Sequence, residues 1–315
     1  MEQLLSLLRD PNMQWIFLGC TLLGLSSGVI GCFSYLRKQS LMGDTLAHAA
    51  LPGICIAFML TGVKSLLVFL IGAGLAGVVA TMGMGIITRH TRIKPDAAMG
   101  IVLSGFFGFG IVLLTLIQHG DYGNQSGLDK FLFGQAAAMI GSDVLTMSVV
   151  CGLMIAVCTL LFKEFKLISF DPGFAKGLGY PVAFLEQLLM FFMVVAVVVG
   201  IQAVGVVLVA ALLITPAVSA RYWTDRLSLM VIISGVFGAV SGAVGTLISS
   251  TAASLPTGPL TVLTASVLFS LSVCFGPKRG LLAKRLARTR VRKSFLASSD
   301  TLQISKEKMN GGAAS

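Results

Sequence analysis

The sequence predicts an all-α, polytopic membrane protein with about eight or nine transmembrane helices, and three observations support this prediction. Of 315 residues, 56% are hydrophobic and only 11% are charged, whereas a soluble domain carries about 25% charged residues. The mean hydropathy is +0.92. The apolar residues also gather in runs close to the roughly 20 residues that a helix needs to cross a bilayer. A helix satisfies its own backbone hydrogen bonds in lipid, so these runs predict transmembrane helices.

Most of the apolar runs have the length of a single crossing. Short polar or charged stretches separate them, as expected of loops at the two membrane surfaces. The chain also contains 36 glycines, which suit closely packed membrane helices because small residues let two backbones approach. The runs are 14–36, 45–62, 65–88, 98–117, 143–162, 188–220, 228–250 and 260–276.

The run 188–220 is too long for one crossing. It carries Gly200, Gln202 and Gly205 in its middle and Thr215-Pro216 near its end. We predict a broken or re-entrant segment that goes out, breaks around Gln202 and returns. Such irregular backbone is tolerated at membrane depth only where it is buried in protein or lines a cavity.

The positive charge of the chain is concentrated at its C-terminal end. The net charge is +10, and residues 277–315 hold ten Lys and Arg against Asp300 and Glu307, so that segment alone carries +8. Basic segments after a last span are typical of cytoplasmic tails that contact anionic lipid. We predict a transmembrane domain over 1–276, a disordered basic cytoplasmic tail over 277–315, and no nucleic-acid partner.

The remaining Lys and Arg predict the orientation in a bacterial cell membrane. With the tail inside, the loops at 37–38, 89–94, 163–176 and 221–226 are also inside and hold ten further Lys and Arg. Only three remain outside, which is the bias expected for this topology. The N-terminus is then outside, provided that 188–220 does go out and back.

The most informative polar residues inside an apolar run are Asp44 and His48. They stand four apart, so they share one helix face. Counted from Lys38 at the inner boundary, they lie roughly 9 Å and 15 Å into a hydrocarbon core of about 30 Å. An ionisable group at that depth costs about 2.5–3.5 kcal/mol on insertion scales. The pair therefore predicts a metal site on a transport pathway.

Pro52 adds a further candidate ligand. A helical residue 52 would donate its N–H to the carbonyl of His48, and proline has no N–H to donate. A carboxylate, an imidazole and a free carbonyl thus gather within about one turn. Oxygen and nitrogen donors suit Mn²⁺, Zn²⁺ or Fe²⁺ better than soft Cu⁺.

The alternative reading of this pair is structural, with Asp44 and His48 bonded to each other or to neighbouring helices. Two side chains are also too few to hold a metal ion well. A dimer would bring two copies together and give an Asp₂His₂ set. We therefore expect a dimeric pathway with the metal site on its axis and no resident cofactor, the metal being cargo.

Three other candidates are weaker. Cys55 shares the face of Asp44 but lies about 10 Å beyond the histidine, too far for the same coordination sphere. His119, with Asp121 and Asp129, is expected in a solvated outer loop. His90 is expected on the surface of a basic inner turn.

A second informative segment lies on the inner side, at 170–181. Asp171 can cap a short helix that has Pro172 at its first position, and a glycine can end it. A capped turn with exposed apolar residues suits a contact with another subunit, although a simple connector gives the same spacing. The residues assigned to this contact are Asp171, Phe174, Ala175, Gly177 and Gly179.

The chain lacks a phosphate-binding loop. No GxxxxGK[ST] pattern occurs, so the sequence offers no usual site for ATP phosphates. If transport is driven by ATP, hydrolysis belongs to a partner subunit.

Several stretches together resemble the metal-ion ABC permease family, whose members import manganese, zinc or iron. The resemblance covers about residues 10–276. It rests on Leu36-Arg37, Leu41-Met42-Gly43-Asp44, His48-Ala49, Leu51-Pro52-Gly53, Leu132-Phe133-Gly134, the turn from Asp171 to Gly179, Gln202-Ala203-Val204-Gly205, and the run from Ala211 to Ala217.

The resemblance implies a non-enzymatic permease subunit that acts as a homodimer or heterodimer. It also implies a cytoplasmic ATPase docked on the inner loop and an extracellular or periplasmic metal-binding protein that delivers cargo. In that family the Asp and His of the second span are thought to line the metal path, and they match Asp44 and His48.

The cargo we expect is Mn²⁺, with Zn²⁺ or Fe²⁺ as alternatives because Asp and His bind all three. A self-sufficient, ion-coupled transporter is a different class, which would need further intramembrane acids. We expect none within a span except Asp44. A membrane sensor or scaffold would need no buried Asp/His pair.

Overall fold

The computed structural model describes residues 11–37, 39, 41–63, 65–119, 141–251 and 255–283. Within these ranges the regular structure is helical and contains no strand. Eight helices are long and apolar enough to cross a membrane, which confirms the predicted fold class. The helices are α2 (Pro11–Leu36), α3 (Met42–Thr61), α4 (Leu66–His90), α5 (Pro95–His119), α7 (Gly141–Leu160), α8 (Phe162–Phe170), α9 (Pro172–Gly177), α10 (Val182–Val204), α11 (Val206–Arg221), α12 (Leu227–Ser249) and α13 (Thr257–Phe275).

The predicted break in the long apolar run is present, three residues later than expected. Helix α10 continues to Val204, and the chain turns at Gly205, whose φ of 91° favours glycine. A Cβ on Gly200 would meet the side chain of Val209, so the two helices lie side by side. Pro216 remains inside α11.

The contacts at the two ends of α11 show that this segment goes out and back. At its start, Val204 lies against Gly258 in the first turn of α13. At its end, the carbonyl of Tyr222 accepts a hydrogen bond from the N–H of Lys278, beyond the end of α13. Helix α11 therefore runs from one face of the bundle to the other, in addition to the eight longer spans among the described residues, which places Pro11 and Lys278 at opposite ends.

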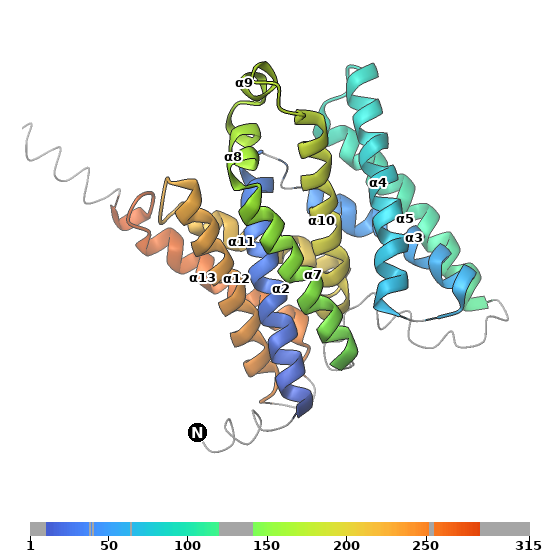
Figure 1. The fold of residues 1–315 in the computed structure, drawn as a ribbon. Helices are drawn as coiled ribbons and strands as arrows, with labels where there is room; N and C mark the ends of the chain where they lie inside the picture. Colours follow the sequence, from blue (N-terminus) through green and yellow to red (C-terminus); the bar gives the residue numbers. More distant parts are fainter. Residues whose placement is uncertain are drawn as a thin grey trace, which may run out of the picture.

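The bundle has two parts in Figure 1. Helices α3, α4 and α5 pack together on one side, while α2, α7, α11, α12 and α13 form the other, with α10 between them. The short helices α8 and α9 project beyond the ends of α7 and α10. The Asp44/His48 segment thus belongs to the three-helix part.

Small residues make the closest helix crossings. On α2 and α12, Gly24 meets the backbone of Gly238, and Gly28 meets that of Ser234. Ser234 also donates a 2.7 Å hydrogen bond to the carbonyl of Gly28. The predicted role of glycine in close packing holds here because membrane helices associate by direct backbone approach.

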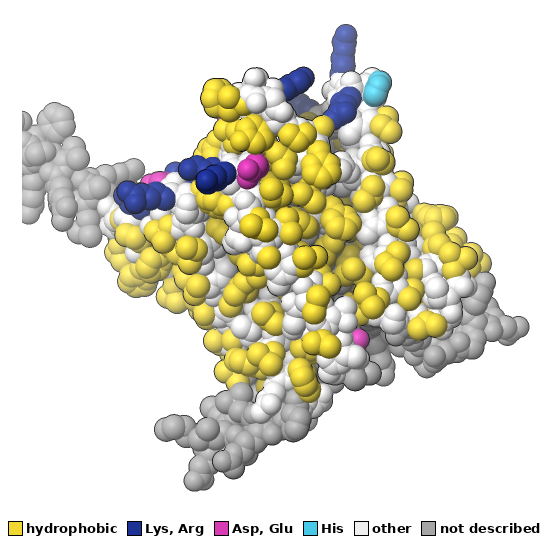
Figure 2. All heavy atoms as spheres, viewed as in Figure 1, with side chains coloured by type: hydrophobic (Ala, Val, Ile, Leu, Met, Phe, Trp, Pro, Cys, Tyr) yellow, Lys and Arg dark blue, Asp and Glu magenta, His cyan; other side chains and the backbone are white. Residues whose placement is uncertain are grey.

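Every Lys and Arg among the described residues lies at one end of the bundle, which we name the basic end. Figure 2 shows these side chains along the upper edge, above a wall of apolar side chains. This one-sided distribution of Lys and Arg is the bias on which the predicted orientation rests. The residues are Arg37, Arg89, Arg92, Lys94, Lys163, Lys166, Lys176, Arg221, Arg226, Lys278 and Arg279.

Candidate metal site and coupling helix

Asp44 and His48 lie on the first two turns of α3, on one face as predicted. The neighbouring positions on this helix, including Thr45, Leu46 and Ala47, are buried. The Asp44 side chain is 41% exposed and that of His48 is 19% exposed. The pair therefore forms the open strip of the otherwise buried first half of α3.

The geometry of the pair differs from that of a hydrogen bond. His48 Nε2 and Asp44 Oδ1 are 3.6 Å apart, longer than a hydrogen bond allows. The two atoms therefore form no mutual hydrogen bond and lie close enough together to reach one metal ion.

His48 is held in place by packing. Its ring lies 4.7 Å from the ring of Phe107 on α5, edge to face. The Nδ1 atom is buried and has no hydrogen-bond partner among the described residues. A buried nitrogen of this kind usually has a partner, and the second nitrogen of a metal-bound histidine nearly always does. The single chain leaves this requirement unmet.

Helix α3 passes through Pro52 without ending. The carbonyl of His48 consequently receives no N–H from residue 52. The structure thus retains the predicted third donor, which is the carbonyl oxygen of His48 itself.

No other ligand completes the site within one chain. Among the described residues, no three His, Cys, Asp or Glu side chains come together. Cys55 is buried with its sulfur directed at the carbonyl of Gly110. His119 and His90 are exposed at helix ends, each bonded to a carbonyl of its own helix. Asp121, Asp129 and Leu132–Gly134 lie outside the described residues.

Helix α5 presents two different exposed faces. On the side of Phe107, exposed Ser104, Gly108, Ile111 and Thr115 follow the helical spacing. On the other side, Ile101 and Phe109 line an apolar groove of about 890 Å³ against α3 and α4. The first face adjoins Phe107, which contacts His48, and carries small, polar and apolar side chains.

A cavity of about 490 Å³ opens between α3, α4, α5 and α10 at the basic end. Met42, two residues before Asp44, lines it together with Arg37 and Glu186. Arg37 Nη2 and Glu186 Oε1 are 2.6 Å apart, with the arginine side chain only 11% exposed. The pair joins the end of α2 to α10, beside the start of α3.

Glu186 corrects one expectation. We expected no acid inside a span except Asp44, but α10 starts at Val182 and its membrane-length segment includes Glu186, and those of α5 and α7 include Asp96 and Asp143 in their first turns. The apolar run gave a start at 188 because Glu186 and Gln187, in the second turn of α10, interrupt the apolar residues. Neither Glu186 nor Phe107 was assigned to the site. For Glu186, the available signal was an acidic residue next to the predicted start of a helix. For Phe107, one phenylalanine among many gave no signal.

The inner turn contains the predicted capped helix. Asp171 is the N-cap of α9, with its carboxylate accepting a 2.9 Å hydrogen bond from Phe174 N–H, and Pro172 follows at the first position. Gly179, with φ 84°, lies just past the end of the helix. The local fold follows from cap, proline and glycine.

The two apolar residues of α9 lie on opposite sides. Phe174 is 58% exposed, whereas Ala175 is fully buried among the core residues of the molecule. Phe170, Leu178 and Phe184 are also largely exposed around the same tip. A direct contact with another subunit can involve Phe174, while Ala175 supports the helix from beneath. Gly177 has no neighbour within 4 Å of a Cβ added to it.

The fold and the site define a polytopic membrane permease with an Asp/His pair on one of its spans. Residues 9–276 match the model of the ABC 3 transport family, and the chain belongs to this family.

Individual relatives carry metal-transport names. The chain is 53% identical over 292 residues to the manganese transport system membrane protein MntC of Bacillus subtilis, covering 93% of this chain and 67% of the relative. It is 45% identical to the zinc transport system membrane protein TroC of Treponema pallidum, covering 92% and 98%. Among solved structures, PsaBC from Streptococcus pneumoniae in complex with Fab matches with a TM-score of 0.80 and 32% identity, covering 90% of this chain and 99% of that one.

Proposed function

We propose that this permease carries a divalent transition metal ion into the cell, with Mn²⁺ as its physiological cargo. The observation that carries the proposal is the Asp44/His48 pair, partly exposed on one face of α3 at a spacing that suits a shared metal ion. The manganese-named relative at 53% identity supports the choice of metal.

The site is completed by a second copy of the chain or by a paralogue. The described part of one chain supplies two side-chain ligands and no partner for the Nδ1 atom of His48. The exposed face of α5 beside Phe107 offers a surface on which two copies can approach. Two copies give an Asp₂His₂ set, with carbonyls or water filling the remaining positions.

The basic end faces the cytoplasm, following the distribution of Lys and Arg. Metal reaches Asp44 and His48 from an extracellular or periplasmic binding protein on the opposite side. It then leaves through the cavity that Met42 lines at the basic end.

Energy comes from a separate ATPase subunit that contacts α9. The helix is capped by Asp171, and Phe174 projects from it. An exposed phenylalanine on a rigid support suits insertion into a groove of a partner. Replacing Phe174 with Asp should detach the ATPase or uncouple its hydrolysis from uptake, whereas Lys163→Gln on the preceding helix serves as the control. If co-purification and uptake were both unchanged, the ATPase would contact another part of the permease.

The choice of Mn²⁺ over Zn²⁺ follows from the need for release. A mixed oxygen and nitrogen site completed by water accepts the six-coordinate shell of Mn²⁺. Zn²⁺ prefers four ligands and binds such sites more tightly, so it would leave slowly and act as an inhibitor of the pathway.

The test is growth of a strain that lacks the permease, in metal-depleted medium with single metals added back. Rescue by manganese, together with restored manganese uptake when the permease is expressed with its partner subunits, supports the proposal. Rescue by zinc alone would make this a zinc importer. Uptake by the permease without any ATPase would instead favour a self-sufficient transporter.

A further inference from the structure

A second group of charged side chains lies at the basic end, far from Asp44 and His48. It occupies the turn between α11 and α12 and the residues that follow α13. Arg221, Arg226, Lys278 and Arg279 supply four positive charges, and Asp225 is the one acidic side chain that pairs with them within the described part of the chain. We name these four basic residues, with Trp223, the α11–α13 rim.

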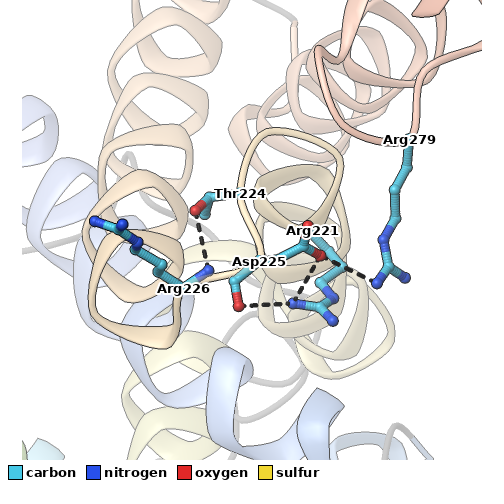
Figure 3. Close-up of polar contacts among 5 residues, drawn as sticks. All are labelled: Arg221, Thr224, Asp225, Arg226 and Arg279. Atoms are coloured by element: carbon cyan, nitrogen blue, oxygen red, sulfur yellow. Dashed lines mark hydrogen bonds and ion pairs between the residues drawn. The ribbon is translucent and has the colours of Figure 1, made fainter. Parts of the chain in front are cut away.

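Asp225 fixes the geometry of the rim. Its Oδ1 lies 3.5 Å from Arg221 Nη1 and 3.1 Å from Arg279 Nη2, and its backbone carbonyl accepts a hydrogen bond from Arg221. Figure 3 shows the two arginines converging on Asp225, while the guanidinium of Arg226 points away from it. The exposed Arg226 and Lys278 side chains form no ion pair with a described residue. The rim therefore keeps a net positive charge after its internal pairing.

The rim borders an apolar wall. Leu271 and Phe275 on α13 and Leu229 on α12 are exposed within about two turns of it, and Leu281 and Leu282 are exposed just beyond it. In Figure 2, basic side chains sit directly on the upper edge of the apolar surface over α12 and α13. In a membrane protein this edge marks the level of the lipid headgroups.

The environment of Trp223 also indicates that the rim lies at the level of the lipid headgroups. Its side chain is 40% exposed, and its indole N–H donates a 3.0 Å hydrogen bond to Ser272 Oγ. The ring also packs edge to face on Phe237, with centroids 6.0 Å apart. A tryptophan with one apolar side and one bonded N–H is typical of the membrane–water interface.

From this arrangement we propose that the α11–α13 rim binds the phosphate groups of anionic phospholipids in the adjoining leaflet. Arginine and lysine donate charge-assisted hydrogen bonds to phosphate oxygens, and basic clusters just beyond a span attract anionic lipid. A second protein is a less suitable partner because the rim stands lower than α9 in Figure 1, level with the upper ends of α12 and α13.

The chain offers a local reporter for the test. It contains two tryptophans, Trp15 and Trp223, which lie toward opposite ends of the bundle. In a Trp15→Phe background, the full-length protein in nanodiscs then carries a single tryptophan in the rim. Quenching by brominated phosphatidylglycerol, compared with brominated phosphatidylcholine at equal mole fraction, measures the local preference for anionic lipid.

We expect stronger quenching by phosphatidylglycerol and loss of the preference at high salt. Each Lys or Arg near the surface contributes about fivefold to lipid partition, so the triple change Arg226→Gln, Lys278→Gln, Arg279→Gln should reduce it by roughly two orders of magnitude. The matched control is Arg92→Gln, Lys163→Gln, Lys166→Gln, which removes three charges elsewhere at the basic end and should leave the preference intact.

Equal quenching by the two lipids in the otherwise unchanged protein would overturn the proposal. So would loss of the preference on adding inorganic phosphate at constant ionic strength, since the rim would then be a site for soluble phosphate. Protection of Trp223 from both lipids by the partner ATPase would identify the rim as a protein contact instead. The readout does not involve transport, so it can fail without affecting the proposed metal import.

Discussion

Two acidic residues, Asp44 and Asp225, each have a nitrogen-bearing side chain four residues away on the same segment. The separations are almost equal, at 3.6 Å for Asp44 and His48 and 3.5 Å for Asp225 and Arg221. Their surroundings differ. Asp225 also pairs with Arg279 at the surface, whereas Asp44 pairs with no other residue in the described structure and sits on a transmembrane helix.

The two carboxylates differ in whether their negative charge is still available to bind a further cation. Arginine is always charged, so two of them saturate Asp225. Histidine can be neutral, and a neutral imidazole is a metal ligand, so the charge of Asp44 remains available to a cation. The same spacing thus gives a structural clamp in one place and a candidate transport site in the other.

The largest expected effect comes from removing a ligand. Either Asp44→Ala or His48→Ala should abolish metal uptake while leaving assembly with the ATPase intact. In a dimer of two copies each variant removes two of the four side-chain ligands, about half of a metal-binding free energy of roughly 10–16 kcal/mol, so affinity should fall by more than about 1,000-fold. Radiolabelled manganese uptake and co-purification measure the two outcomes. Near-normal uptake by either variant would mean that Asp44 and His48 have a structural role.

A sharper form of the comparison converts the first pair into the second. His48→Arg should give Asp44 a permanent ion-pair partner, as Arg221 does for Asp225. Uptake should fall to background, and the thermal midpoint should change little because the new charge is paired. His48→Gln, which supplies no charge, is the companion variant. If His48→Arg transported metal, the carboxylate would not be a ligand.

Breaking the second pair should have a modest effect. Asp225→Asn removes a carboxylate that is 51% exposed and paired at the surface, where ion pairs contribute about 0–1 kcal/mol. We expect the thermal midpoint of the purified protein to fall by a few degrees at most and manganese uptake to remain within about twofold of normal. A loss of uptake as large as that of Asp44→Ala would contradict the assignment of Asp225 to a structural clamp.

The smallest effect is expected at Cys55. Its sulfur is buried against Gly110 and does not join Asp44 and His48. Cys55→Ser should leave uptake unchanged, since the hydroxyl fills a similar volume and can bond a carbonyl of its own helix. A cargo-selective defect, measured as a change in the ratio of zinc to manganese uptake, would give the cysteine a role in the pathway.

The sequence by itself determined the elements and the local chemistry. Apolar length predicted the spans, Lys and Arg predicted which loops share one end, and Asp171-Pro172 predicted a capped helix, because each of these depends on residues close in the chain. The spacing of Asp44 and His48 placed them on one face for the same reason. The start of α10 was missed because Glu186 and Gln187 in its second turn interrupt the apolar signal.

Only the tertiary structure decided which faces are open and which groups distant in the chain meet. Sequence periodicity cannot tell that Ala175 is buried while Phe174 is exposed, since that depends on where α8 and α10 pack. The contact of His48 with Phe107, the pairing of Arg37 with Glu186, and the approach of Arg279 to Asp225 all join separate helices. Such contacts follow from helix packing, in which small residues set how closely backbones approach, and no local pattern encodes them.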